Sequence, residues 1–208
     1  MTAAVLKKQF ESDLGGLLDW RSRPVPETVA TGIAEIDSVI GGLPRGSLTE
    51  IFGPASSGRT SLLISILATA TARQESCALV DAEDAFDPAS AEAAGVRLDR
   101  VLWIRCAHNA EHALKATDLL VQGGGFGLVA MDLGDTSPAA ARRISMVSWF
   151  RLRRAVEYTP TVLIALARQS NTKTCASLML ECQRERVAWE FGALPVPLCV
   201  HVSLYFRI

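Results

Sequence analysis

The chain has 208 residues, of which 49% are hydrophobic, and this predicts one soluble α/β domain with a full core. Its formal net charge of -1 at pH 7 excludes nucleic-acid binding through an overall basic surface, so any such binding must be local. No apolar run reaches the roughly 20 residues that cross a membrane, and the N-terminus lacks a signal-peptide pattern, so we expect a cytoplasmic protein.

The first 28 residues form an N-terminal unit ahead of a predicted core domain at residues 29–208. Apolar residues in the first part of this unit recur every three or four positions, which predicts a helix with one apolar stripe. Two prolines in residues 21–28 then indicate an extended linker. Such a helix either packs on its own domain or docks on a neighbouring molecule, and both readings stay open.

A glycine-rich loop at residues 53–60 reads GPASSGRT, close to the phosphate-binding pattern GxxxxGK[ST]. A predicted strand at 48–52 precedes it and a predicted helix at 61–72 follows it. The two glycines let backbone N–H groups converge on phosphate oxygens at the positive end of that helix. The predicted nucleotide-binding residues here are Gly53, Ser56, Ser57, Gly58, Arg59, Thr60 and Ser61.

Arg59 stands where this pattern has lysine. A guanidinium can hold phosphate as a fork, but it is too large to sit where a compact ammonium bridges the β and γ phosphates. The hydroxyl of Thr60 is a predicted Mg²⁺ ligand. We therefore expect ATP or ADP with Mg²⁺ to bind weakly or not at all, and turnover to suffer.

Further predicted strands lie at residues 77–81, 101–104 and 128–132, with a helix at 110–122. Asp132 ends the third of these strands, after four apolar residues, and is a predicted partner of Mg²⁺ through water. His108 and His112 have i, i+4 spacing, but no partner pattern nearby favours a metal site there.

A basic segment spans residues 136–155 and contains no acidic residue. Apolar and aromatic residues alternate with its arginines, so it is either a surface for nucleic acid or an acidic partner, or a helix with a buried apolar side and solvated arginines. The candidate contact residues are Arg142, Arg143, Arg151, Arg153 and Arg154.

Residues 162–167 predict one more buried strand, and Gln169 follows it. Residues 177–190 and 198–208 alternate in polarity and predict strands, the first of them either continuous or a hairpin that turns near residues 183–185. Residues 192–197 join the two.

Two stretches carry a resemblance to the RecA recombinase core. TGIAEIDSVIGGLPRGSLTEIFGPASSGRTSL begins at Thr31, and VDAEDAFDPASAEAAGVRLDRVLWI begins at Val80. The resemblance covers roughly residues 30–170 and implies a RecA-like P-loop fold: a mostly parallel sheet flanked by helices, with an antiparallel extension at its C-terminal edge.

The resemblance also implies roles for single residues. Glu83 takes the position of the glutamate that activates the attacking water, at the end of a strand that we expect beside the P-loop strand; the alternative is a solvated loop acid. Asp87 is retained at the nucleotide site, next to Ser90 where the family has an aromatic residue that stacks on adenine. Gln169 is a candidate sensor of the γ-phosphate, although Arg168 fits that position equally well.

Several departures weaken the reading of an active recombinase. They are Arg59, Ser90, a shortened second DNA loop, the missing C-terminal domain of the family and the lack of any lysine after Lys173. A truncated core of this kind, with its PAAARRISMVSWFRLRRAVEYTP segment, resembles the ImuA family, RecA-related accessory proteins of bacterial inducible-mutagenesis cassettes.

That resemblance implies a regulatory protein of SOS-type DNA repair and translesion mutagenesis. Its implied partners are RecA and error-prone polymerase components, and residues 1–28 are a candidate for self-association. The alternatives are an active DNA-dependent ATPase or recombinase paralogue with a variant Walker A motif, and a small nucleic-acid binder. Whether the protein is an enzyme stays open.

Overall fold

A computed structural model describes residues 27–186 and 201–207, and the side chains of residues 27–184. The predicted N-terminal helix, its linker up to residue 26 and the segment at residues 192–197 lie outside these residues. No helix in the described part of the chain is long and apolar enough to span a membrane.

The backbone forms a seven-stranded sheet with the order β5-β4-β6-β7-β3-β8-β9, and a separate two-stranded sheet of β1 and β2. All neighbours in the large sheet are parallel except β8 and β9, which pair antiparallel. The strands are β1 (Thr28–Val29), β2 (Leu43–Pro44), β3 (Ser47–Phe52), β4 (Cys77–Asp81), β5 (Val101–Arg105), β6 (Leu128–Leu133), β7 (Val162–Ala167), β8 (Leu178–Arg186) and β9 (His201–Arg207). The predicted fold class, a mostly parallel sheet with an antiparallel extension at its C-terminal edge, is confirmed.

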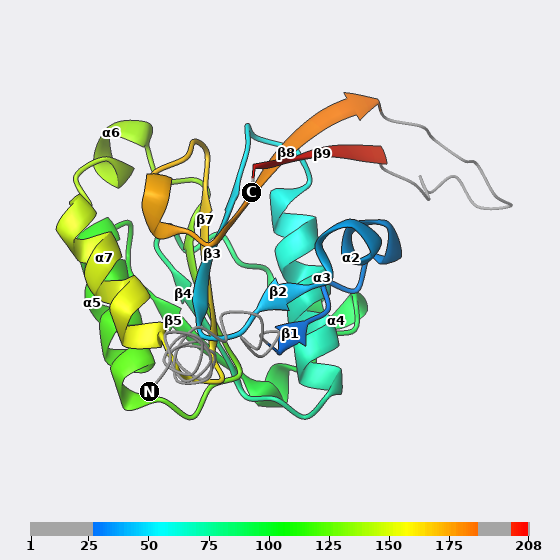
Figure 1. Ribbon diagram of the computed structural model, residues 1–208, viewed down its shortest axis with the longest axis horizontal. Helices are drawn as coiled ribbons and strands as arrows, with labels where there is room; N and C mark the ends of the chain where they lie inside the picture. Colours follow the sequence, from blue (N-terminus) through cyan, green and yellow to red (C-terminus); the bar gives the residue numbers. More distant parts are fainter. Residues whose placement is uncertain (1–26, 187–200, 208) are drawn as a thin grey trace, which may run out of the picture.

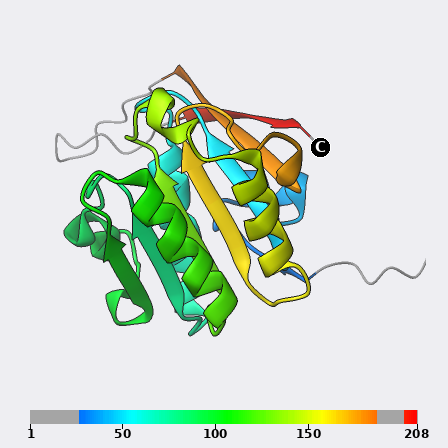
Figure 2. The same cartoon turned by 90° about the vertical axis from the view of Figure 1, so that its left-hand side faces the viewer.

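Helices cover both faces of this sheet, as Figure 1 shows, with α2, α3 and α4 on one side and α5, α6 and α7 on the other. Figure 2 looks onto the second face, where α5 and α7 lie side by side across the strands. The α-helices are α2 (Ala34–Ile40), α3 (Arg59–Ala72), α4 (Pro88–Ala93), α5 (Ala110–Gly123), α6 (Pro138–Ala141) and α7 (Met146–Val156). Two short 3-10 turns, η2 (Leu98–Arg100) and η3 (Lys173–Cys175), complete the described elements.

The core has two halves because successive side chains of each strand point to opposite faces of the sheet. In β4, Leu79 packs with Leu63 and Ile66 of α3. The neighbouring Val80 packs in the other half, which contains Trp149 and Leu152 of α7. The strands therefore read as nearly continuous apolar runs, as expected of a sheet that is covered on both faces.

The structure corrects one prediction about the last strands. β8 is a single strand through residues 183–185, so the hairpin reading is wrong and the continuous reading holds. A register shift between Gln183 and Arg186 interrupts its ladder with β9 at this place. A β-bulge disturbs the pairing without ending the strand. The polar residues that suggest a turn therefore lie within one continuous strand.

Candidate functional site

The predicted site residues gather at the carboxyl edge of the parallel strands. The strand register places Asp81 beside Asp132 and places Phe52, which leads into the P-loop, beside Ala167 at the end of β7. Ligands bind at this edge of open α/β sheets because loops from several strands meet there. The predicted grouping of the P-loop, Asp132 and the end of β7 is therefore present.

The P-loop connects β3 to α3, and two of its glycines allow the backbone conformation and the close packing that this connection needs. Gly58 precedes the helix with φ 92°. An added Cβ at Gly53 would overlap the carbonyl oxygen of Cys182 in β8. Both glycines thus shape the loop so that the amino end of α3 faces the carboxyl edge of the sheet.

The side chain of Arg59 lies inside the protein and is 5% exposed. Its guanidinium donates hydrogen bonds to the carbonyl oxygen of Gly53 and, over 2.6 Å, to that of Gly134 in the loop after β6. It also lies 3.5 Å from the carboxylate of Asp135. Burial lowers the pKa of Arg59 from its usual value, and the charge of Asp135 opposes that shift. The guanidinium therefore ties the P-loop to the Asp132 loop.

Because Gly134 has no side chain, Arg59 and Asp132 can lie close to its backbone. A Cβ there would stand 2.8 Å from Oδ1 of Asp132 and 3.2 Å from Nε of Arg59. Arg168 donates to the same carbonyl oxygen over 3.2 Å and lies 3.5 Å from Asp135. Two guanidinium groups thus share one carbonyl oxygen and one carboxylate at the centre of the site.

Asp132 is a largely buried carboxylate that accepts a hydrogen bond from the backbone N–H of Gly134 over 2.7 Å. Burial raises the pKa of Asp132 to about 6, and the Gly134 hydrogen bond works in the opposite direction. The group is therefore an anion at pH 7 but binds a proton more readily than an exposed aspartate does.

A cavity of about 180 Å³ opens beside the P-loop, and its lining includes Arg59, Thr60, Asp87, Ser90 and Asp132. The predicted magnesium ligands Thr60 and Asp132 thus face one space. Ser56 is exposed on the loop and Ser61 is exposed in the first turn of α3, whereas Ser57 is buried. Asp87 caps α4 and accepts a hydrogen bond from Ser90, which lowers the pKa of Asp87.

The residues present fit a phosphate group and its magnesium ion. Nε of Arg59, a residue of the cavity lining, is a buried polar atom without a hydrogen-bond partner in the described part of the chain; Oγ of Ser57 is unpaired there too, but Ser57 is not part of the lining. Within the same residues, no group of three or more His, Cys, Asp or Glu side chains could hold a metal alone. Magnesium at Thr60 and Asp132 would therefore depend on oxygens from the nucleotide, as is usual for this ion.

Glu83 does not line the cavity, and its strand is not beside β3. In the strand order, β6 and β7 separate β4 from β3, so that part of the prediction is wrong. The carboxylate accepts a hydrogen bond from Oγ1 of Thr136 over 2.8 Å and contacts Nδ1 of His108 over 2.9 Å. Glu83 is thus held by the loops after β5 and β6, with its side chain 22% exposed.

Arg168 and Gln169 differ sharply in position. Arg168 reaches Gly134 and Asp135, whereas the side chain of Gln169 is exposed and makes no hydrogen bond within residues 27–184. The carbonyl oxygen of Gln169 accepts a bond from the side chain of Asn171 over 2.8 Å. Of the two candidates, the structure brings Arg168 to the site.

The basic segment forms two helices, α6 and α7, on the second face of the sheet. Trp149, Leu152 and Val156 are buried, as the helical reading predicts. Arg151 pairs with Asp118 of α5 over 3.3 Å, and Arg153 pairs with Glu157 over 3.3 Å. Within residues 27–184, the remaining arginines of the segment form no ion pair: Arg142, Arg143 and Arg154.

Sequence reasoning missed the residues that hold the site together. Asp81 is 1% exposed and accepts hydrogen bonds from the backbone N–H groups of Glu83, Ala85 and Phe86, which fixes the loop after β4. An aspartate that ends an apolar strand before two further acids was the available signal. No sequence pattern indicates the contacts of Gly134 and Thr136, because these contacts join loops that are distant in the sequence.

Comparisons with known proteins agree with this geometry. A family model described as the RecA N-terminal domain matches residues 5–141. The chain is 34% identical over 154 residues to Protein RecA of Rickettsia canadensis, a match that covers 66% of this chain and 45% of that protein. It is 39% identical over 131 residues to Protein RecA of Borrelia hermsii, which covers 60% of this chain and 36% of the relative. The chain thus spans less than half the length of these curated relatives.

Proposed function

The chain belongs to the RecA family, and from this premise we propose that it is an accessory protein of the ImuA type, which regulates SOS-type DNA repair and translesion mutagenesis. It acts mainly through contacts with other proteins and binds ATP or ADP with Mg²⁺ weakly. It hydrolyses ATP slowly or not at all.

The observation that carries this proposal is the position of Arg59. To direct its Nη1 and Nη2 atoms at a phosphate, the guanidinium must leave the carbonyl oxygens of Gly53 and Gly134, since only Nε is without a partner in the described part of the chain. The carbonyl oxygen of Gly134 keeps its bond from Arg168, but leaving that of Gly53 without this donor costs about 1–3 kcal/mol, which is lost from nucleotide affinity. The loss of adenine stacking at Ser90 adds to it, because aromatic stacking is worth about 0.5–1.5 kcal/mol.

The proposed partners are RecA and error-prone polymerase components, with self-association through residues 1–28 as a further contact. A pull-down of the full chain with purified RecA and with those polymerase components tests this, and a variant that lacks residues 1–28 is run beside it. Loss of binding in the shortened variant assigns the contact to these residues, and retained binding moves it to the core. If the full chain binds none of these proteins, this choice of partners is wrong.

An active ATPase with a variant Walker A motif is a second candidate, because Thr60 and Asp132 still face one cavity with Arg59. Steady-state ATP turnover, measured with and without single-stranded DNA, separates the two. We expect turnover at background level in both conditions. Clear turnover that DNA stimulates and that Glu83→Gln abolishes would contradict the regulatory proposal.

A minimal nucleic-acid binder is the third candidate, favoured by the exposed Arg142 and Arg154, which form no ion pair within residues 27–184. It predicts DNA binding that weakens steeply with salt and is lost when both residues are changed to alanine. We expect at most weak DNA binding, because the ion pairs of Arg151 and Arg153 interrupt the positive surface.

A further inference from the structure

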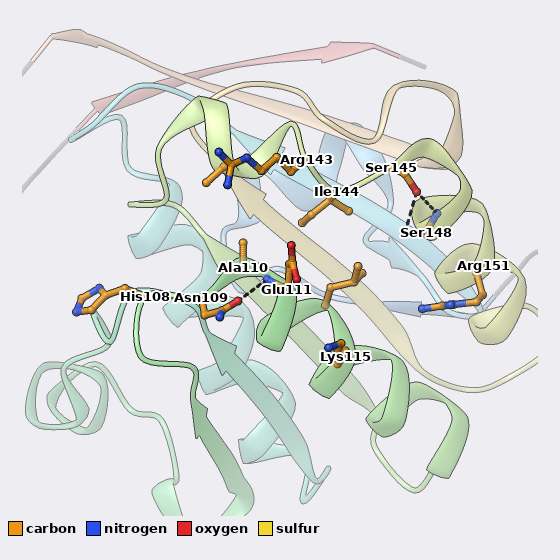
Figure 3. A pocket seen from close by; sticks show the side chains of 12 residues that line it. His108, Asn109, Ala110, Glu111, Lys115, Arg143, Ile144, Ser145, Ser148 and Arg151 are labelled. Atoms are coloured by element: carbon orange, nitrogen blue, oxygen red, sulfur yellow. Dashed lines mark hydrogen bonds between the residues drawn. The ribbon is translucent and has the colours of Figure 1, made fainter.

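A second and larger cavity, of about 530 Å³, lies away from the P-loop between α5, α6 and α7. Figure 3 shows its lining: Glu111 and Lys115 lie on α5, while Arg143 lies in the turn after α6 and Arg151 lies on α7. We call this space the α5–α7 groove. Its volume is in the range of sites that hold a small molecule or a few residues of a peptide.

Charge in the groove is positive but discontinuous. Lys115 and Arg143 make no ion pair or side-chain hydrogen bond within residues 27–184, and both are exposed. Arg151 is already paired with Asp118, and the carboxylate of Glu111 lies in the same lining. Such a groove attracts single carboxylates, whereas a nucleic-acid backbone needs an unbroken positive track.

Apolar surface accompanies these charges. Leu114 and Ile144 form part of the lining. Val147 is 77% exposed and Phe150 is 50% exposed on α7, and together with Arg154 they follow at spacings of three and four. Residues at these spacings form one stripe on a helix, and this stripe lies on a different face of α7 from Ser148 and Arg151, which line the groove.

We propose that the α5–α7 groove docks an acidic peptide segment of a partner protein, in which aspartate or glutamate alternates with aliphatic or aromatic residues. The carboxylates pair with Lys115 and Arg143, and the apolar side chains cover Leu114 and Ile144 of the lining. This inference rests on the proposed function, in which the protein works through protein contacts, and it supplies the chemistry of one such contact.

A random 12-residue peptide library displayed on phage, selected on the immobilised full chain, tests the proposal. We expect the selected peptides to combine at least two acidic residues with Leu, Ile or Phe. A synthetic copy of the strongest peptide, labelled with fluorescein, should bind the double variant Lys115→Glu, Arg143→Glu at least tenfold more weakly. Arg97→Glu, an exposed charge reversal outside the groove, is the matched control and should change binding less than twofold.

The double variant should keep the thermal midpoint of the wild type, because Lys115 and Arg143 have no ion pair to lose within residues 27–184. Arg97→Glu loses only an exposed pair with Asp99, which contributes little to stability. Selection of no acidic peptide, or equal binding by the double variant, would overturn the assignment. If a fluorescein-labelled oligothymidylate binds instead and the double variant loses it, the groove is a nucleic-acid surface and the peptide assignment is wrong. None of these outcomes depends on ATP turnover, so failure here is distinguishable from failure of the regulatory proposal.

Discussion

At the scale of single residues, Arg59 and Arg168 direct their N–H donors to groups of the protein itself at the candidate site. Arg59 and Arg168 both bind the carbonyl oxygen of Gly134, and both lie 3.5 Å from Asp135. The sequence marks Arg59 as a departure from the P-loop pattern and indicates that its guanidinium cannot replace an ammonium. It does not reveal where the side chain goes, because Gly134 is 75 residues away and belongs to no motif.

Asp132 gives a prediction about pH. Its pKa is about 6 in the folded protein against 3.8 for an ordinary aspartate, because burial penalises the charged form. The folded state therefore binds this proton more tightly than the unfolded state does. The resulting stability is fully present below pH 3.8 and is lost as the pH rises through 6.

Asp132→Asn removes this titration and keeps an acceptor for the Gly134 N–H. Relative to the wild type, its free energy of unfolding should rise between pH 4 and pH 6, by at most about 3 kcal/mol. Urea unfolding at pH 4.5, 6 and 7.5 measures the difference, with the exposed Asp99→Asn as control. A difference between Asp132→Asn and wild type that does not change with pH would show that burial does not raise this pKa.

At the scale of elements, apolar runs and glycines predict the parallel strands closely. Strands expected at 77–81 and 162–167 form with these bounds, and the helix expected at 110–122 ends one residue later. Buried strands are distinctive because both faces are covered. The order of the strands is not predicted correctly, because it depends on how the connections between the strands pack. From the sequence we expect β4 beside β3, whereas β6 and β7 separate them.

The short loop after β7 is held by a buried carboxylate that no sequence motif predicts. Glu50 in β3 is fully buried and accepts hydrogen bonds from the backbone N–H groups of Asn171 and Thr172, over 2.6 and 3.0 Å. The hydroxyl groups of Ser170 and Thr172 each donate to its other oxygen over 2.8 Å. One carboxylate therefore fixes the segment that follows Arg168 and Gln169.

Glu50→Ala should destabilise the fold by about 3–5 kcal/mol, because four donors lose their acceptor in the interior. Glu50→Gln keeps the size and one acceptor oxygen, and should cost about half as much. Glu157→Ala is the control: its side chain is 39% exposed and its ion pair with Arg153 is worth at most about 1 kcal/mol. Urea unfolding compares the three. Equal midpoints for Glu50→Ala and Glu157→Ala would mean that the loop is not held by Glu50.

At the scale of the whole molecule, the candidate nucleotide site lies at the carboxyl edge of the large sheet, while the α5–α7 groove lies between helices on its second face. The proposed function relies on this separation, because it combines a RecA-type core with weak nucleotide binding. The sequence predicts the family resemblance, the P-loop and Asp132, because these residues follow motifs. It does not predict the groove, because a cavity between α5, α6 and α7 depends on how helices from separate parts of the chain pack.

The central claim is that Arg59 binds the protein's own carbonyl groups at the expense of phosphate. Equilibrium binding of a fluorescent ATP analogue with Mg²⁺, measured on the full chain and on Arg59→Lys, tests it most directly. Arg73→Lys, at the other end of α3, is the matched control. We predict that Arg59→Lys binds about tenfold more tightly than the wild type, a gain of about 1.4 kcal/mol, and that the control does not change. If the wild type already binds the analogue tightly and Arg59→Lys binds it equally or more weakly, the carbonyl contacts of Arg59 do not oppose phosphate binding.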